Sequence, residues 1–225
     1  MKFTYYGHAC FAIETKGKTL LFDPFISPNP MAKAIDVASL KPDYILVSHG
    51  HGDHIADCAA ISRQSGAEVI SIPEVIGWLQ KNGVEKVAPM NHGGKKDIGV
   101  GTVKLVNAVH SSGLPDGSYG GNPAGIVVKG EKNFYYSGDT ALTMDMQLIP
   151  KWTKLDFAIL CIGDNYTMGY EDAIEAAKMV ECKTVIGVHY DTFPVIKIDH
   201  EQAKKAFADA GITLHLLNIG ESIEF

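Results

Sequence analysis

The stretch SHGHGDHIADC, residues 48–58, constrains the fold of this chain more than any other part of its sequence. It places His49, His51, Asp53 and His54 within six consecutive positions, directly after the apolar run YILV. The two interleaved glycines let the backbone turn sharply there. On such a turn His49 and His51 point the same way, while Asp53 and His54 swing toward a neighbouring position. Imidazole and carboxylate groups suit Zn, Mn, Fe or Ni, so we expect a metal site at the end of a buried strand.

Further ligands for a catalytic metal site must come from other parts of the chain. Three later residues each close an apolar, strand-like run: His110 after VKLVNAV, Asp139 after FYYSG and His189 after TVIGV. Side chains carried at one end of several strands converge on one edge of the sheets. We therefore expect the site at that edge.

The order of apolar patterns predicts an α/β fold of a single domain, residues 1–225. Each half of the chain opens on strands and then alternates strand with helix, and no low-complexity linker separates the halves. Two β-rich layers covered by helices on both sides, a four-layer αβ/βα sandwich, is the economical packing of that order. Helical patterns are expected at residues 33–40, 55–66, 74–83, 144–150, 170–180 and 200–211.

Composition and charge argue against several classes of protein. The formal net charge of −6 gives no broad basic surface for a phosphate backbone, so we expect a small-molecule substrate rather than nucleic acid. The four cysteines form no C-x-x-C pair, which argues against a thiolate zinc knuckle and favours reduced, buried thiols. No signal-peptide pattern and no apolar run of about 18 residues is found, so we expect a cytoplasmic protein without a membrane span.

The loop SSGLPDGSYGGNPAG, residues 111–125, is dense in glycine and proline. A loop of this length inside a compact domain is usually functional, and its glycines permit movement. We expect it to form the rim of the substrate site. Tyr190 and Phe193, which follow His189, fit a pocket wall and ordinary packing equally well.

The ordered residues described above resemble the ligand set of the metallo-β-lactamase superfamily. The matching words are H-x-H-x-D-H at 49–54, then His110, S-G-D-T at 137–140 and His189, and the similarity covers nearly the whole chain. The flanking words YYGHACF, LLFDPF, NYTMG and GVHYDTFP are similar to a bacterial family of metal-dependent hydrolases. That family is close to the ascorbate-6-phosphate lactonase and N-acyl-phosphatidylethanolamine phospholipase D branches.

The resemblance implies a dinuclear metal centre. The implied ligands are His49, His51 and His110 for the first ion, Asp53, His54 and His189 for the second, and Asp139 as the bridge. A water between two such ions loses a proton near neutral pH, and the hydroxide attacks an electrophile whose oxygen the metals polarise. Zinc is the expected metal, with manganese, iron and nickel as alternatives. Asp53 would have a catalytic role as well, relaying a proton to the leaving group.

Two further residues have two interpretations each. Asp23, in LLFDPF, either accepts the second ring N–H of a metal-binding histidine or caps the local backbone before Pro24. His8, in YYGHACF, either faces the substrate or a metal, or is simply hydrogen-bonded in place beside an apolar strand.

The expected function is hydrolysis of a small ester, lactone or phosphodiester, with self-association as a homo-oligomer implied by the relatives. The chain lacks a basic arm, a β-CASP domain and a partner domain for flavin or haem. Two alternatives are a phosphodiesterase or nuclease on the same centre, and a non-catalytic metal-binding regulatory protein. The presence of every ligand position argues against the second alternative.

Overall fold

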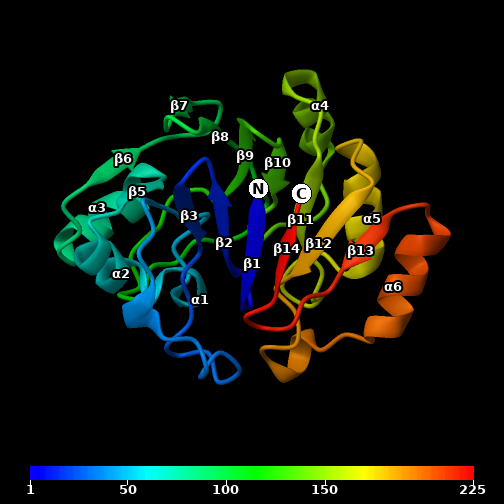
Figure 1. Cartoon of the computed structure of the whole chain (residues 1–225), viewed down its shortest axis with the longest axis horizontal. Coiled ribbons are helices and arrows are strands. Elements are labelled where there is room, and N and C mark those ends of the chain that lie inside the picture. Colours follow the sequence, from blue (N-terminus) through cyan, green and yellow to red (C-terminus); the bar gives the residue numbers. More distant parts are fainter.

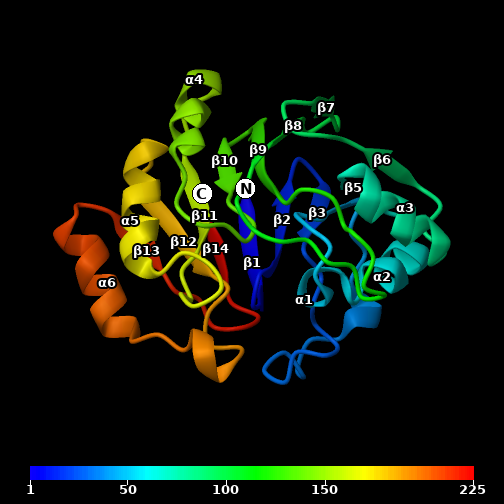
Figure 2. The ribbon, with the colours of Figure 1, turned by 180° about the vertical axis from the view of Figure 1, so that it is seen from behind.

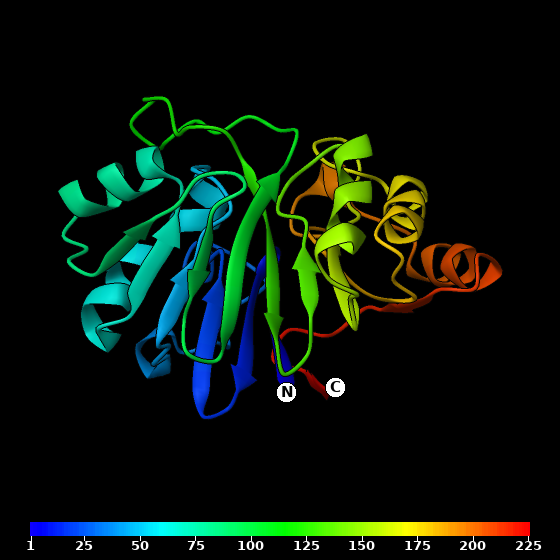
Figure 3. The same cartoon turned by 90° about the horizontal axis from the view of Figure 1, so that it is seen from above.

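The computed structural model describes residues 1–225 as two seven-stranded sheets packed face to face, with helices on both outer sides (Figure 1). Seen from above, α-helices of the first half of the chain flank one sheet and those of the second half flank the other (Figure 3). The predicted four-layer αβ/βα sandwich is therefore confirmed.

Each sheet has an antiparallel half and a parallel half. The first runs in the order β14 (Ser222–Glu224), β1 (Lys2–Gly7), β2 (Cys10–Thr15), β3 (Lys18–Phe22), β4 (Tyr44–Leu46), β5 (Glu68–Ser71) and β6 (Val87–Pro89). The second runs in the order β13 (Thr213–His215), β12 (Thr184–Val188), β11 (Phe157–Cys161), β10 (Phe134–Tyr136), β9 (Ala124–Gly130), β8 (Gly101–Asn107) and β7 (Lys95–Asp97). Strands β3 to β6 are parallel, as are β10 to β13. Their carboxyl ends therefore meet at one edge of each sheet.

The helices follow the order of the chain. Beside the first sheet lie α1 (Gly52–Ile55), α2 (Cys58–Ser65) and α3 (Pro73–Lys81), and beside the second lie α4 (Ile149–Trp152), α5 (Tyr170–Met179) and α6 (His200–Asp209), as Figure 2 shows from behind. Three single-turn 3₁₀ segments are η1 (Val37–Ser39), η2 (Met144–Leu148) and η3 (Pro194–Ile196). No helix is long and apolar enough to cross a membrane.

Two helix predictions need correction. The helix expected over 33–40 is wrong, because only η1 forms there and none of its residues is buried. The Asp36 carboxylate accepts the backbone N–H of Ala38, a local bond that competes with a longer helix. The pattern at 55–66 is interrupted between α1 and α2, where Asp57 instead accepts the backbone N–H groups of Ile26 and Ser27.

Aromatic side chains fill the space between the two sheets. The Phe11 ring stacks on Phe3 and Phe22, with centroids 5.0 and 4.5 Å away, and meets Tyr136 of the opposite sheet edge-on at 5.0 Å. All four rings are fully buried. This packing fixes the distance between the sheets, and therefore the distance between the strand ends that they present.

We expect Phe11→Ala to reduce the free energy of unfolding by about 3–5 kcal/mol, because it opens a cavity among these rings. Chemical denaturation measures the change. Leu148→Ala is the control: that side chain is 65% exposed and its truncation should cost less than about 0.5 kcal/mol. A small effect at Phe11 would show that the sheets repack without it.

Candidate metal centre

The seven predicted ligands lie just beyond the carboxyl ends of strands from both sheets. Asp139 is the meeting point, because its Oδ2 atom faces four imidazole nitrogens. The Nε2 atoms of His189, His54, His110 and His49 lie 3.0, 3.3, 3.6 and 4.0 Å from it, respectively. Asp139 is only 3% exposed, so these groups meet away from bulk water.

Besides a group that joins Asp23 to His49 and His54, the possible ligand atoms form two groups, each within 4.8 Å. The first comprises His49, His51 and His110, and the second comprises His8, Asp53, His54 and His189. In the first group His49 Nε2 lies 3.0 Å from His51 Nδ1. The structure therefore brings together both sets expected from the sequence, and adds His8 to the second.

A buried carboxylate, Asp23, orients two of these histidines. Its Oδ1 accepts the backbone N–H of Ser48 at 2.7 Å, and its Oδ2 accepts His54 Nδ1–H at 2.8 Å and the Tyr136 hydroxyl at 2.6 Å. The Ser48 hydroxyl also donates to Oδ2, and its oxygen lies 2.9 Å from His49 Nδ1. Asp23 therefore holds a histidine, the first of its two interpretations. The backbone N–H that it accepts, that of Ser48, belongs to a distant segment and not to the local turn before Pro24.

These bonds determine which ring nitrogens keep a free lone pair. Because a carboxylate only accepts, His54 carries its proton on Nδ1. The Ser48 hydroxyl donates its hydrogen bond to Asp23, so its oxygen can only accept from His49, which therefore also donates from Nδ1. In both histidines Nε2 is left as the acceptor, and both Nε2 atoms face Asp139.

Burial and charge shift the pKa values of these groups in opposite directions. Burial holds the pKa of His49 well below its usual range, and burial together with His189 lowers the pKa of His8 to about 4. Burial also opposes a charge on His54, but Asp139 and Asp23 outweigh it and hold that pKa well above its usual range. Burial likewise opposes the Asp139 charge, yet His189 and His54 keep its pKa well below the usual range.

The arrangement fits divalent metal ions. His54 Nε2, Asp139 Oδ1 and His189 Nδ1 are buried without a hydrogen-bond partner. With its proton on Nδ1, His54 presents a lone pair to a carboxylate oxygen 3.3 Å away, and only a cation or an added proton between them relieves that repulsion. A donor set of imidazoles and carboxylates is the kind that holds zinc, manganese, iron or nickel.

His8 is held in place by bonds from both ring nitrogens. Its Nε2 lies 3.1 Å from Asp53 Oδ2 and its Nδ1 lies 3.0 Å from the Thr192 hydroxyl oxygen. Since Asp53 can only accept, Nε2–H donates to it, and Nδ1 faces the Thr192 hydroxyl, which also lies 3.3 Å from the Tyr190 carbonyl oxygen. In this arrangement His8 orients Asp53, and its Nδ1 is directed at Thr192 and not at the other ligands.

Backbone strain is concentrated at the same edge. His8, Asp23 and His189 are non-glycine residues in the left-handed region, with φ of 55°, 39° and 58°. The His189 N–H donates to the His8 carbonyl at 2.8 Å, which ties the two sheets together. Gly163 lies so close to the His189 carbonyl that a Cβ there would sit 2.1 Å from its oxygen.

The loop 111–125 is tied to the ligand turn. The Ser112 hydroxyl accepts the backbone N–H of Gly50 at 2.9 Å and lies 3.0 Å from the Gly120 carbonyl, to which it donates. Farther along, Trp78 of α3 donates its indole N–H to Asp116 at 3.0 Å. The loop thus supports the turn between His49 and His51.

Sequence reasoning missed four residues that support the site: Ser48, Ser112, Tyr136 and Thr192. Ser48 directly precedes His49, and Tyr136 precedes S-G-D, so their proximity to ligands was a usable signal. Nothing in the sequence indicates which side chain each hydroxyl reaches.

Comparisons with known proteins agree with this geometry. Residues 18–190 match the family described as Beta-lactamase superfamily domain. A protein of Flavobacterium johnsoniae named UPF0173 metal-dependent hydrolase is 54% identical over 225 residues, covering 100% of both chains. One of the same name from Methylacidiphilum infernorum is 50% identical, covering 99% of both. Igni18, a metallo hydrolase from Ignicoccus hospitalis, is similar in structure with a TM-score of 0.89 and 33% identity, covering 100% of this chain and 98% of its own.

Two adjacent tyrosines of β10 test the Asp23 network. We expect Tyr136→Phe to lower the free energy of unfolding by about 1.5–3 kcal/mol, because it removes a donor from a buried carboxylate. Tyr135→Phe is the matched control, since Tyr135 is equally buried but its hydroxyl has no partner. That variant should be as stable as the parent or more so. Equal costs in denaturant titrations would contradict the role given to Tyr136.

Proposed function

We propose, from the premise that this chain belongs to the beta-lactamase superfamily and within it to the UPF0173 metal-dependent hydrolases, that it binds two divalent ions and hydrolyses a small ester, lactone or phosphodiester. Its general activity, metal-dependent hydrolysis, comes with that family. The observation that supports a two-ion site is the convergence of four imidazole Nε2 atoms on Asp139 Oδ2 between two groups of ligand atoms.

The proposed ligands are His49, His51 and His110 for one ion, Asp53, His54 and His189 for the other, and Asp139 for both. Zinc is the preferred metal, with manganese, iron and nickel as alternatives. When bound, two such ions acidify a water molecule and polarise the oxygen of the carbonyl or phosphoryl group under attack.

The residues of the chain supply the orientation and the protons. Asp23, directly and through Ser48, holds a ring proton on the Nδ1 atoms of His54 and His49, so Nε2 is the nitrogen that each histidine can offer to an ion. His8 holds Asp53 by one oxygen only, and the Asp53 side chain remains 28% exposed. Asp53 is thus proposed to pass a proton to the leaving group in addition to its ligand role.

The proposed location is the reducing cytoplasm. All four cysteines are free and buried, which is the usual state of thiols in that compartment.

Metal content and turnover test the ligand assignment together. We expect His51→Ala and Asp139→Asn each to lower turnover at least about a hundredfold and to bind less metal, because each removes a ligand atom. Elemental analysis of chelator-free protein and a panel of esters, lactones and phosphodiesters measure both effects. Circular dichroism checks the fold, and His215→Ala, on β13, is the control. Undiminished turnover in either ligand variant would refute the mechanism.

Metal affinity should rise with pH beyond the range of ordinary histidines. Because Asp139 and Asp23 hold the pKa of His54 well above its usual value, an ion must displace a proton from His54. Between about pH 7.5 and 8.5 ordinary histidines are already neutral, so the proton that an ion displaces from His54 adds a dependence of up to about tenfold per pH unit to that of any proton lost by a water on the ions. Calorimetric titrations in buffers of different ionisation enthalpy count the released protons. A pH-independent affinity in this window would contradict the raised pKa.

A further inference from the structure

An apolar surface borders the second group of ligands. The His8 ring, whose centroid is 4.1 Å from that of His189, meets Phe25 and Phe193 edge-on with both centroids at 5.4 Å. The two phenylalanine rings are 6.5 Å apart. Both therefore lie one side chain away from the proposed second ion.

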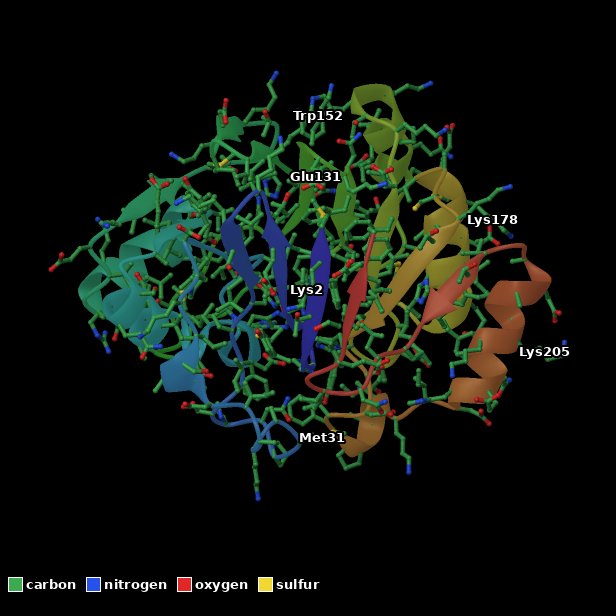
Figure 4. The ribbon with its side chains drawn as sticks, in the orientation of Figure 1. Lys2, Met31, Glu131, Trp152, Lys178 and Lys205 are labelled. Carbon is green, nitrogen blue, oxygen red and sulfur yellow. The ribbon has the colours of Figure 1, made fainter.

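The two segments that carry Phe25 and Phe193 also carry exposed apolar side chains. Phe25 is 7% exposed, whereas Met31 and Val195, on the same two segments, are 52% and 54% exposed. The segment after β3 and the η3 turn run along the same lower edge of the molecule in Figures 1 and 2, and Figure 4 shows Met31 at that edge. Phe25, Met31, Phe193 and Val195 are called the apolar rim below.

The composition of the rim segments argues against recognition of a charged group by the rim itself. Residues 24–32, PFISPNPMA, and residues 192–196, TFPVI, contain no Asp, Glu, Lys or Arg, and exposed lysines, Lys33 and Lys197, follow directly after the two segments. A site for a sugar phosphate would need cationic or multiple hydrogen-bonding side chains at this place. A rim without charged side chains instead favours the binding of a hydrocarbon group.

The rim is also held in shape without a ligand. The Asp57 carboxylate accepts the N–H groups of Ile26 and Ser27 at 2.7 and 2.9 Å, and the Asn29 side chain accepts the N–H of Met31 at 2.9 Å. Four prolines in the two segments restrict the backbone further. Exposed apolar side chains on a preorganised backbone lose little entropy when they bind an apolar group.

We infer that the apolar rim binds an apolar group of the substrate, attached next to the bond that is hydrolysed. The substrate is therefore a hydrophobic ester, lactone or phosphodiester rather than a polar sugar derivative. This inference rests on the proposed function, because it takes the substrate to be bound at the metal centre beside His8.

Binding of alkylphosphonates to the zinc-loaded protein tests the rim without requiring turnover. We expect hexylphosphonate to bind at least about tenfold more tightly than methylphosphonate by calorimetry, because part of the chain leaves water. In the double variant Met31→Ser, Val195→Ser this ratio should fall toward one. Leu148→Ser is the matched control: it is 65% exposed and precedes α4, which lies at the opposite edge in Figure 1, so the ratio should not change.

Two outcomes would overturn the inference: equal affinity for both phosphonates in the parent protein, or an unchanged ratio in the double variant. If the ratio is unchanged and the oligomer mass of the double variant falls by light scattering, the rim is a contact between copies of the chain. A parent protein that prefers hexylphosphonate but hydrolyses no ester, lactone or phosphodiester would refute the proposed function and leave the rim as an apolar binding surface.

Discussion

The Asp23 carboxylate is the constraint on which the rest of the site depends. It is fully buried, yet it accepts four donors: the N–H and hydroxyl of Ser48, His54 Nδ1–H and the Tyr136 hydroxyl. A buried carboxylate with fewer partners would carry a large desolvation cost, so the network has to be complete to be stable. Because it is complete, it fixes the ring protons of two histidines and leaves their Nε2 atoms facing Asp139.

The fold makes this network available by joining two similar sheets through a dry aromatic core. The parallel halves of both sheets end at the same edge, and β8, which is antiparallel to β9 and so runs in the direction of β10, ends there too. Residues after β4, β8, β10 and β12 therefore reach one volume. Low polarity around that volume strengthens each interaction among the charged groups. The same burial explains why the lone pairs left on His54 and Asp139 require a cation or a proton between them.

His8 links the metal centre to the surface that we assign to the substrate. Its Nε2 orients Asp53, and its Nδ1 lies against the Thr192 hydroxyl. Its ring packs between His189 and two phenylalanines. One side chain thereby couples a proposed ligand, a proposed proton donor and the apolar rim. In this structure His8 positions Asp53, and its lowered pKa keeps it neutral there.

The sequence by itself predicted the layered α/β fold and the first four residues of the cluster, because hydrophobic periodicity and the spacing of His49 to His54 are local properties. His110, Asp139 and His189 were expected from their places at strand ends, and the complete set from the resemblance to the superfamily. It could not determine the partners of Asp23 and His8: Tyr136 is 113 positions from Asp23, and Thr192 is 184 positions from His8. It also failed at residues 33–40, where a side-chain bond to the backbone replaced the expected helix. Only the tertiary structure decided which ring nitrogens of His49 and His54 carry protons, which side chains hold His8, and how the rim is shaped. Each of these depends on contacts between segments that are far apart in the sequence.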